Sequence, residues 1–245
     1  MADAASEAPW LVGVVSAPAA VDAFARTAPA SRLVDLLEVR VDLFPTPDVA
    51  SLISSWAAAG ARVEATGTPV LVTIRLASEG GRWTRPDAER LALFREAVAF
   101  ASWLDVEVAS PLARDVTALA RARGGTSVVS HHDFARTPPL PELERLVAAC
   151  RAAGADVPKV ATKVNDAADR ATLFALTAAE TGRACVIGMG PEDLRVELPA
   201  RGSRLAYGYL DAPTAHGQLS VAEMDARLRA ASPAYAARRA AGVTA

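Results

Sequence analysis

Cysteine and histidine are scarce in this sequence, and the few that occur form neither a disulfide pattern nor a metal-binding pattern. Cys150 and Cys185 are the two cysteines among 245 residues, and no C-x-x-C or Cys/His spacing surrounds them. The sequence therefore excludes a disulfide framework and favours a reduced, cytoplasmic protein with both thiols in its core. "HHD" (131–133) is neither H-x-H nor H-E-x-x-H, so we expect no metal site.

Runs of one charge sign and long apolar runs are also lacking. The formal net charge is −2 and no basic stripe appears, which argues against binding to nucleic acid or to an acidic membrane surface. No apolar stretch approaches the roughly 18 residues needed to span a bilayer, and "MADAASEAPW" lacks the basic-then-apolar order of a secretory signal. We therefore expect no membrane and no nucleic acid as partner, but a small molecule.

The abundant residues predict a parallel α/β fold. Hydrophobic residues make up 51% of the chain, enough for a large core. Short β-branched runs alternate with Ala/Leu/Arg segments of helical period, which is typical of β-α units. The strand candidates are 10–15, 35–41, 70–75, 103–108, 126–131, 157–162, 183–188 and 204–210. About 30 residues per unit fits a single-domain (β/α)8 TIM barrel over residues 1–245. The alternative, a doubly wound open sheet, would carry G-x-G-x-x-G in its first turn, and this chain has none there.

Helices are expected at 19–29, 48–59, 87–101, 111–123, 140–153 and 166–181, with a last one at 219–230. Residues suited to cap or begin them are Asp48, Asp87, Asp166 and Ser220, and residues suited to end them are Gly60, Gly124, Gly154 and Gly182. Segment 189–203 contains Pro191, Pro199 and Gly202 and is expected to be mainly loop.

Charged side chains interrupt three of the predicted strands. They are Glu38, Arg40 and Asp42 on the second, Arg75 and Glu79 after the third, and Asp105 and Glu107 on the fourth. Strand alternation directs the second-strand and fourth-strand groups into the barrel, where the C-terminal strand ends carry the chemistry. Two glycines after Glu79 allow a sharp turn. One interpretation is a structural ion-pair network, and the other is a site in which arginine forks onto a substrate carboxylate.

Two polar segments follow later strands. The fifth strand ends at His131 and His132, and we expect one of them to act as a base, because its pKa near neutrality suits proton transfer. After the last strand, "DAPTAHGQLS" (211–220) offers Thr214, His216 and Gln218 to hydrogen-bond a polyol as the loop closes. A plain turn with a helix cap is the alternative.

Lysine is the scarcest charged residue. Only two of the 26 basic residues are lysine, and both Lys159 and Lys163 lie in "VPKVATKVN" (157–165). They share one strand parity, so at least one amine is expected inside the barrel. A guanidinium stays protonated, whereas a desolvated amine beside other cations loses a proton and attacks a carbonyl. This placement favours Schiff-base chemistry, and two surface-directed amines are the other interpretation.

The order of these motifs resembles that of type I 3-dehydroquinate dehydratases, the Schiff-base enzymes of the shikimate route. "EVRVD" (38–42) is similar to the family's E-x-R-x-D, and "RLASEGG" (75–81) to R-x-x-x-E-G-G. "HDFARTP" (132–138), "PKVA" (158–161) and "TAHGQ" (214–218) are similar to H-D-F-x-x-T-P, P-K-[IV]-A and S-A-P-G-Q. The motifs are collinear through nearly the whole chain.

The resemblance implies roles for nine residues. Lys159 would condense with the C3 ketone of 3-dehydroquinate, His132 would be the acid and base, and Glu79 would orient and tune His132. The residues that would hold the carboxylate and hydroxyls are Glu38, Arg40, Arg75, Arg195, Thr214 and Gln218. The resemblance further implies no metal or organic cofactor, and a homodimer.

Two segments depart from the family pattern. "MGPEDLRVELP" (189–199) is shorter than the family's loop and has Leu194 where a serine precedes the arginine, and His216 replaces a proline. Two other functions stay open. Another class I aldolase or lyase would share Lys159, and a catalytically silent paralogue would bind a shikimate-like metabolite.

Overall fold

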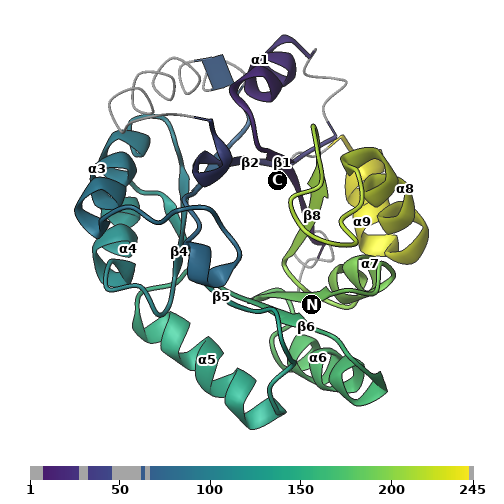
Figure 1. Cartoon of the computed structure of the whole chain (residues 1–245). Helices are drawn as coiled ribbons and strands as arrows, with labels where there is room; N and C mark the ends of the chain where they lie inside the picture. The colour runs from purple at the N-terminus through teal and green to yellow at the C-terminus, as the bar shows by residue number, and fades with distance from the viewer. Residues whose placement is uncertain (1–7, 28–32, 46–61, 64–66, 243–245) are drawn as a thin grey trace.

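A computed structural model describes residues 8–27, 33–45, 62–63 and 67–242, which form a ring of eight parallel strands (Figure 1). The strands are β1 (Trp10–Val15), β2 (Leu36–Arg40), β3 (Val70–Thr73), β4 (Trp103–Glu107), β5 (Thr126–Asp133), β6 (Val157–Lys163), β7 (Cys185–Met189) and β8 (Leu205–Tyr209). Their order in the sheet is β7-β6-β5-β4-β3-β2-β1-β8. Each strand therefore lies beside its neighbour in sequence, and β8 returns to β1, as in a (β/α)8 barrel and unlike a doubly wound sheet. The predicted fold class is confirmed.

The barrel is nearly closed between β7 and β8. In the described part of the chain no strand ladder joins these two, but backbone hydrogen bonds connect the segments that lead into them. Gly182 N donates to Gly202 O at 2.8 Å, and Arg204 N donates to Ala184 O at 2.9 Å. On its other side β8 pairs with β1 from Trp10 to Val14, so the end of the chain closes the ring onto its start.

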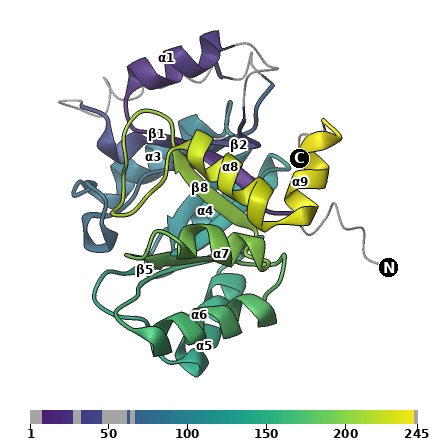
Figure 2. The same ribbon diagram turned by 90° about the vertical axis from the view of Figure 1, so that its right-hand side faces the viewer.

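The helices lie outside the ring of strands, and Figure 2 shows α8 and α9 beside β8. The helices are α1 (Pro18–Arg26), α3 (Asp87–Ala97), α4 (Ala113–Ala122), α5 (Leu140–Ala152), α6 (Ala167–Ala179), α7 (Leu194–Ala200), α8 (Val221–Ala231) and α9 (Pro233–Ala240), with short 3-10 helices η3 (Val41–Leu43) and η4 (Ala77–Glu79). The helix expected at 48–59, with Asp48 and Gly60, lies outside the described residues.

The expected helix boundaries follow from local hydrogen bonds. Asp166 accepts from the N–H groups of Ala168 and Asp169 at the start of α6, and Ser220 forms a capping box with Glu223 at the start of α8. Asp87 is the first residue of α3 and does not cap it with its side chain. The glycines after α4, α5 and α6, at 124, 154 and 182, all have positive φ.

Two helices differ from the sequence expectation. Segment 189–203 is not mainly loop, because α7 occupies part of it: Asp193 accepts from the Leu194 N–H at 3.0 Å, and Leu194 and Leu198 are fully buried in the core. Pro199 is tolerated in the last turn of this short helix. The other is α9, where Ser232 accepts from the Tyr235 N–H and a proline follows at the first helical position.

The strand alternation divides the inside of the barrel into two zones. An apolar cluster fills the N-terminal part with Val12, Leu36, Leu71, Trp103, Val128, Val157, Cys185 and Leu205. Further along the same inward faces the side chains become polar. Outward residues such as Val39, Val72 and Val106 pack in a separate core with the helices. Cys150 and Cys185 are both buried and free, as expected of core thiols.

Candidate active site

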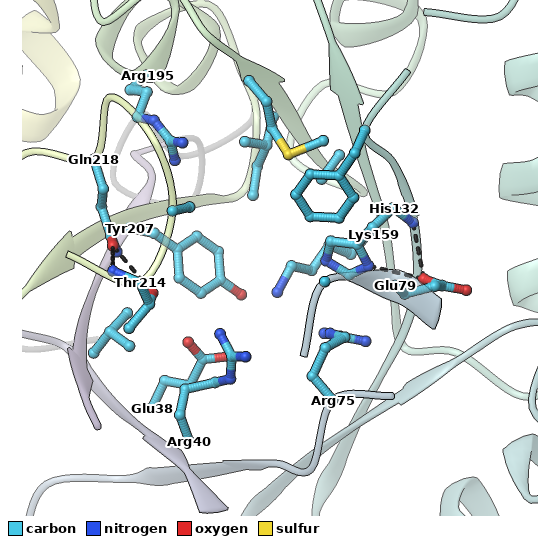
Figure 3. Close-up of a pocket in the computed structure, with 17 residues that line it drawn as sticks. Glu38, Arg40, Arg75, Glu79, His132, Lys159, Arg195, Tyr207, Thr214 and Gln218 are labelled. Atoms are coloured by element: carbon cyan, nitrogen blue, oxygen red, sulfur yellow. Dashed lines mark hydrogen bonds and ion pairs between the residues drawn. The ribbon is translucent and has the colours of Figure 1, made fainter. Parts of the chain in front are cut away.

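A cavity of about 580 Å³ lies at the C-terminal ends of the strands, and it is partly open to solvent. All nine residues to which the family resemblance assigns a role line it: Glu38, Arg40, Arg75, Glu79, His132, Lys159, Arg195, Thr214 and Gln218. They come from β2, β5 and β6, from the segment after β3, from α7 and from the loop between β8 and α8. Figure 3 shows His132 and Glu79 on one side of this space, Thr214 and Gln218 on the other, and Lys159 between them.

The amine of Lys159 lies inside the barrel. The side chain extends from the inward face of β6 and is only 6% exposed. Its Nζ lies 3.0 Å from Asp105 Oδ2 and 4.4 Å from the centre of the Tyr207 ring. Lys163, at the end of the same strand, is partly exposed and does not line the cavity. Of the two lysines, Lys159 therefore faces the space that a ligand can enter.

Asp105 holds two cations in place beneath the cavity. Its Oδ1 accepts from Arg75 Nη2 at 2.9 Å and from Ser130 Oγ at 2.6 Å, while Oδ2 faces Lys159. Burial by itself raises the pKa of Asp105, but the positive charges of Arg75 and Lys159 outweigh it and hold the pKa well below the usual range. The carboxylate is therefore ionised and fixes both cationic side chains.

Glu107 completes this buried ion-pair network. It accepts from Arg75 Nη1 at 2.9 Å and also pairs with Arg90, which is fully buried. The two interpretations of the inward charges thus apply to different residues. Asp105 and Glu107 serve as structural partners, and Arg75 also lines the cavity.

Glu79 and His132 form a hydrogen-bonded pair. Glu79 Oε2 accepts from the backbone N–H of His132 at 2.9 Å and lies 3.0 Å from His132 Nδ1. The glycine turn after Glu79 delivers the carboxylate: Gly80 has φ +78°, and a Cβ there would lie 2.3 Å from the Phe134 ring. His131, the alternative base, is only partly buried and does not line the cavity.

Burial gives this pair unusual acidities. It raises the pKa of Glu79 to about 7, against the pull of the Arg75 charge. Burial, together with the charges of Arg75 and Lys159, holds the pKa of His132 well below its ordinary value of 6.5. The imidazole is therefore neutral at neutral pH. When Glu79 is ionised it can only accept, so the ring proton is assigned to Nδ1 and Nε2 is the basic nitrogen.

Of the three charged residues expected on the second strand, two line the cavity and the third holds one of them in place. Glu38 lines the cavity and its Oε1 accepts from Thr73 Oγ1 at 2.7 Å. Arg40 also lines the cavity and forks onto Asp42 with bonds of 2.9 and 2.8 Å. Asp42 itself lies in η3 after the strand ends and is buried away from the cavity. The expectation that Asp42 faces into the barrel cavity is therefore wrong. Asp42 instead accepts both hydrogen bonds that hold Arg40.

Arg195 is a buried cation without an acidic partner in the described ranges. It belongs to the first turn of α7, not to a loop, and is 7% exposed. Its Nη2 donates to the His216 carbonyl at 2.7 Å, while Nε has no hydrogen-bond partner among the described residues. Burial lowers its pKa to about 10. A guanidinium left in this state is suited to receive an anion from the cavity.

The loop after β8 supplies the opposite wall. Gln218 Oε1 accepts from Thr214 N at 2.8 Å and Thr214 Oγ1 at 3.1 Å. Gly217 has φ +69°, and a Cβ at this residue would lie 2.7 Å from Gly190 O, so the loop packs tightly on the end of β7. The side chain of His216 is exposed and does not line the cavity.

Sequence reasoning missed several lining residues, chiefly Tyr207 and the apolar Val14, Phe134, Ala161, Ile187 and Met189. Tyr207 was within reach of the strand argument, because it alternates with Leu205 on a predicted strand. Within the described ranges, no group of three or more His, Cys, Asp or Glu side chains is placed to hold a metal ion. None of the helices described there has the length and apolar character needed to cross a membrane.

Comparison with known proteins gives a consistent family. Residues 14–233 match the type I 3-dehydroquinase family. The 3-dehydroquinate dehydratase of Methanothrix thermoacetophila is 34% identical over 80% of this chain and 81% of its own length. That of Methanosarcina barkeri is 35% identical over 78% and 82%. In fold, the 3-dehydroquinate dehydratase structure from Geobacillus kaustophilus has a TM-score of 0.79 at 23% identity, with 90% of each chain covered.

Proposed function

The chain belongs to the type I 3-dehydroquinase family, and we propose that it dehydrates 3-dehydroquinate to 3-dehydroshikimate through an imine on Lys159, with His132 as general acid and base. Dehydratase activity on 3-dehydroquinate follows from the family. The roles of the individual residues are our proposal. The observation that carries it is the buried Nζ of Lys159, which shares one cavity with the Glu79–His132 pair.

Imine formation begins at the ketone. The ammonium of Lys159 gives one proton to His132 and attacks C3 as the neutral amine, and the ketone oxygen leaves as water while a C=N bond forms. Asp105 holds Nζ at the wall of the cavity, so the nitrogen is oriented before the substrate arrives. The protonated imine is an electron sink, which makes the neighbouring C2 proton acidic.

His132 then carries the proton. Its neutral imidazole removes the proton from C2, and the electron pair of that C–H bond moves toward the imine. The resulting enamine expels the C1 hydroxyl, which takes a proton from His132 and leaves as water. Hydrolysis of the new imine releases 3-dehydroshikimate and restores Lys159. General acid and base catalysis of this kind typically contributes about 10²–10⁴-fold.

The remaining residues bind the substrate. Of the lysine and arginine side chains that line the cavity, Arg40, Arg75 and Lys159 each pair with a carboxylate, whereas Arg195 has no such partner in the described part of the chain. This supports its pairing with the substrate carboxylate. Arg40 and Arg75 are held by Asp42 and Asp105 and present the rest of their guanidinium donors to the cavity. Glu38, Thr214 and Gln218 supply the polar groups for the hydroxyls.

Borohydride trapping tests the mechanism. The protein is incubated with 3-dehydroquinate and borohydride, and the reduced adduct is located by peptide mass spectrometry while dehydroshikimate absorbance is followed. We expect product, and an adduct on Lys159. The chain offers a matched control because it has two lysines: Lys163→Arg should keep the adduct and Lys159→Arg should lose it.

The other outcomes identify the rival functions. An adduct on Lys159 without dehydroshikimate would indicate a different Schiff-base aldolase or lyase. Neither adduct nor product would indicate a silent paralogue. We further propose a homodimer, as the family resemblance implies, located in the cytoplasm, as the two unpaired cysteines favour. Light scattering of the purified protein tests the dimer.

A further inference from the structure

Tyr207 carries a hydroxyl that the protein leaves unpaired. The residue lies on the inward face of β8 and is 7% exposed. Its Oη is buried and has no hydrogen-bond partner among the described residues. In Figure 3 the hydroxyl end of the ring points into the cavity, toward the amine of Lys159.

The surroundings of Tyr207 give a reason for the ring but not for the hydroxyl. The ring packs in the apolar cluster with Val12, Val14 and Leu205, and its face lies 4.4 Å from Lys159 Nζ. A phenylalanine ring would make both contacts. A buried hydroxyl without a partner is unfavourable, and such groups are rare in folded proteins. The missing partner is therefore expected to come from the ligand.

The chemistry around Oη fixes the kind of partner. Burial raises the pKa of Tyr207 well above 10, so the phenol remains a neutral O–H donor. Arg75 and the ammonium of Lys159 offer only N–H donors, which do not accept its proton. The nearby carboxylates of Glu38 and Asp105 accept from Thr73, Ser130, Arg75 and Lys159 and not from the Tyr207 hydroxyl. The group that completes the hydrogen bond is thus an oxygen atom held close to Lys159. In a Schiff-base enzyme one such atom is the oxygen on the carbon that the amine attacks.

We propose that Tyr207 is a further catalytic residue, which donates a hydrogen bond to the substrate's ketone oxygen while Lys159 forms the imine. This inference rests on the function proposed above and adds a second polar group to its first step. Attack by nitrogen forms the C–N bond and moves the carbonyl π pair onto oxygen. The Tyr207 O–H stabilises the negative charge that develops there, as a donor in an oxyanion hole does.

The proton balance does not require Tyr207 to ionise. Between the ammonium form of Lys159 and the protonated imine, nitrogen sheds two protons. His132 carries these two protons to the ketone oxygen, which leaves as one water molecule when the C–O bond breaks. Tyr207 keeps its own proton throughout and donates again, in reverse, when the product imine is hydrolysed.

The test compares Tyr207→Phe with wild type and with Tyr209→Phe. Tyr209 lies two residues further along, lines a hollow between α1 and α8, and is absent from the catalytic cavity. Saturating 3-dehydroshikimate forms the imine without elimination, and rapid quenching into borohydride gives the rate at which the adduct accumulates. We expect this rate to fall about 10-fold or more in Tyr207→Phe, since one oxyanion donor is lost, and to stay unchanged in Tyr209→Phe. The melting temperature of Tyr207→Phe should equal or exceed that of wild type, because the hydroxyl has no protein partner to lose.

Two results would overturn the proposal. An adduct rate within twofold of wild type would mean that the hydroxyl does not assist imine formation. A higher KM with an unchanged rate at saturation would assign Tyr207 to substrate binding instead. If wild-type protein itself forms no adduct, the proposed function has failed and the role of Tyr207 fails with it, a result distinct from the other two.

Discussion

Replacing Glu79 by glutamine should make the protein more stable and less active. Glu79 is ionised at high pH in a buried position, and its pKa is raised from an ordinary 4.5 to about 7. The folded state therefore binds this proton more tightly than the unfolded state does. The stability associated with the protonated carboxyl is complete below about pH 4.5 and is lost as pH rises through about 7. Glutamine has the same shape without the ionisation.

The size of the effect follows from the pKa. At about 1.4 kcal/mol for each pH unit between 4.5 and about 7, ionised Glu79 costs at most about 3.5 kcal/mol of unfolding free energy. Glu79→Gln should gain up to that amount at pH 8 and little at pH 4.5. The backbone N–H of His132 keeps an acceptor in the glutamine oxygen, so the gain is not offset there.

Catalysis should change in the opposite direction. Without the carboxylate, the Nδ1–H of His132 loses a charge-assisted hydrogen bond worth about 1.5–3 kcal/mol, so kcat should fall about 10- to 100-fold. In wild type, kcat/KM should rise with pH up to about 7, the titration of the Glu79–His132 pair. In Glu79→Gln this limb should disappear, since the pKa of His132 lies well below 6.5.

Urea unfolding at pH 4.5 and pH 8, with steady-state kinetics from pH 5 to 9, measures both effects. Glu144→Gln is the control, because Glu144 is exposed on α5 and does not line the cavity. Equal stability of wild type and Glu79→Gln at pH 8 would refute the argument from burial. If kcat/KM of the variant still rises with pH up to about 7, another group titrates there.

Three further predictions concern the charges around the cavity. Lys159→Met should abolish borohydride trapping and lower kcat by about 10⁴-fold or more, whereas a variant that still gives the adduct would rule out Lys159 as the nucleophile. Asp105→Asn should destabilise the protein by about 3–5 kcal/mol in urea, because Lys159 loses its buried counter-charge and Arg75 keeps only Glu107, and the difference should shrink as pH falls below about 3.8, where unfolded Asp105 is protonated. Arg195→Met should raise KM about 100-fold while leaving the urea midpoint unchanged or higher, and an unchanged KM would remove Arg195 from carboxylate binding.

Local sequence patterns predicted the strands better than they predicted the last helices of the chain. The strand expected at 10–15 agrees with β1, because a short apolar run with three valines ends before Ser16 and Pro18. Segment 189–203 was misjudged because Pro191 and Pro199 suggest a loop. In the structure one proline precedes α7 and the other falls in its last turn, where few hydrogen bonds are lost. Ser232 followed by Pro233 is itself a sequence signal for the start of α9.

For the site, the sequence by itself determined which side chains face inward and at which end of the barrel they gather. Parity placed Glu38, Arg40 and Lys159 correctly, because alternation is a property of a single strand. The tertiary structure alone decided the partners: Asp105 between Arg75 and Lys159, Arg195 without a counter-charge in the described ranges, and Tyr207 with an unpaired hydroxyl. The physical reason is that pairing depends on distances between residues of different strands. Those distances are set only when the ring closes and its neighbours are fixed.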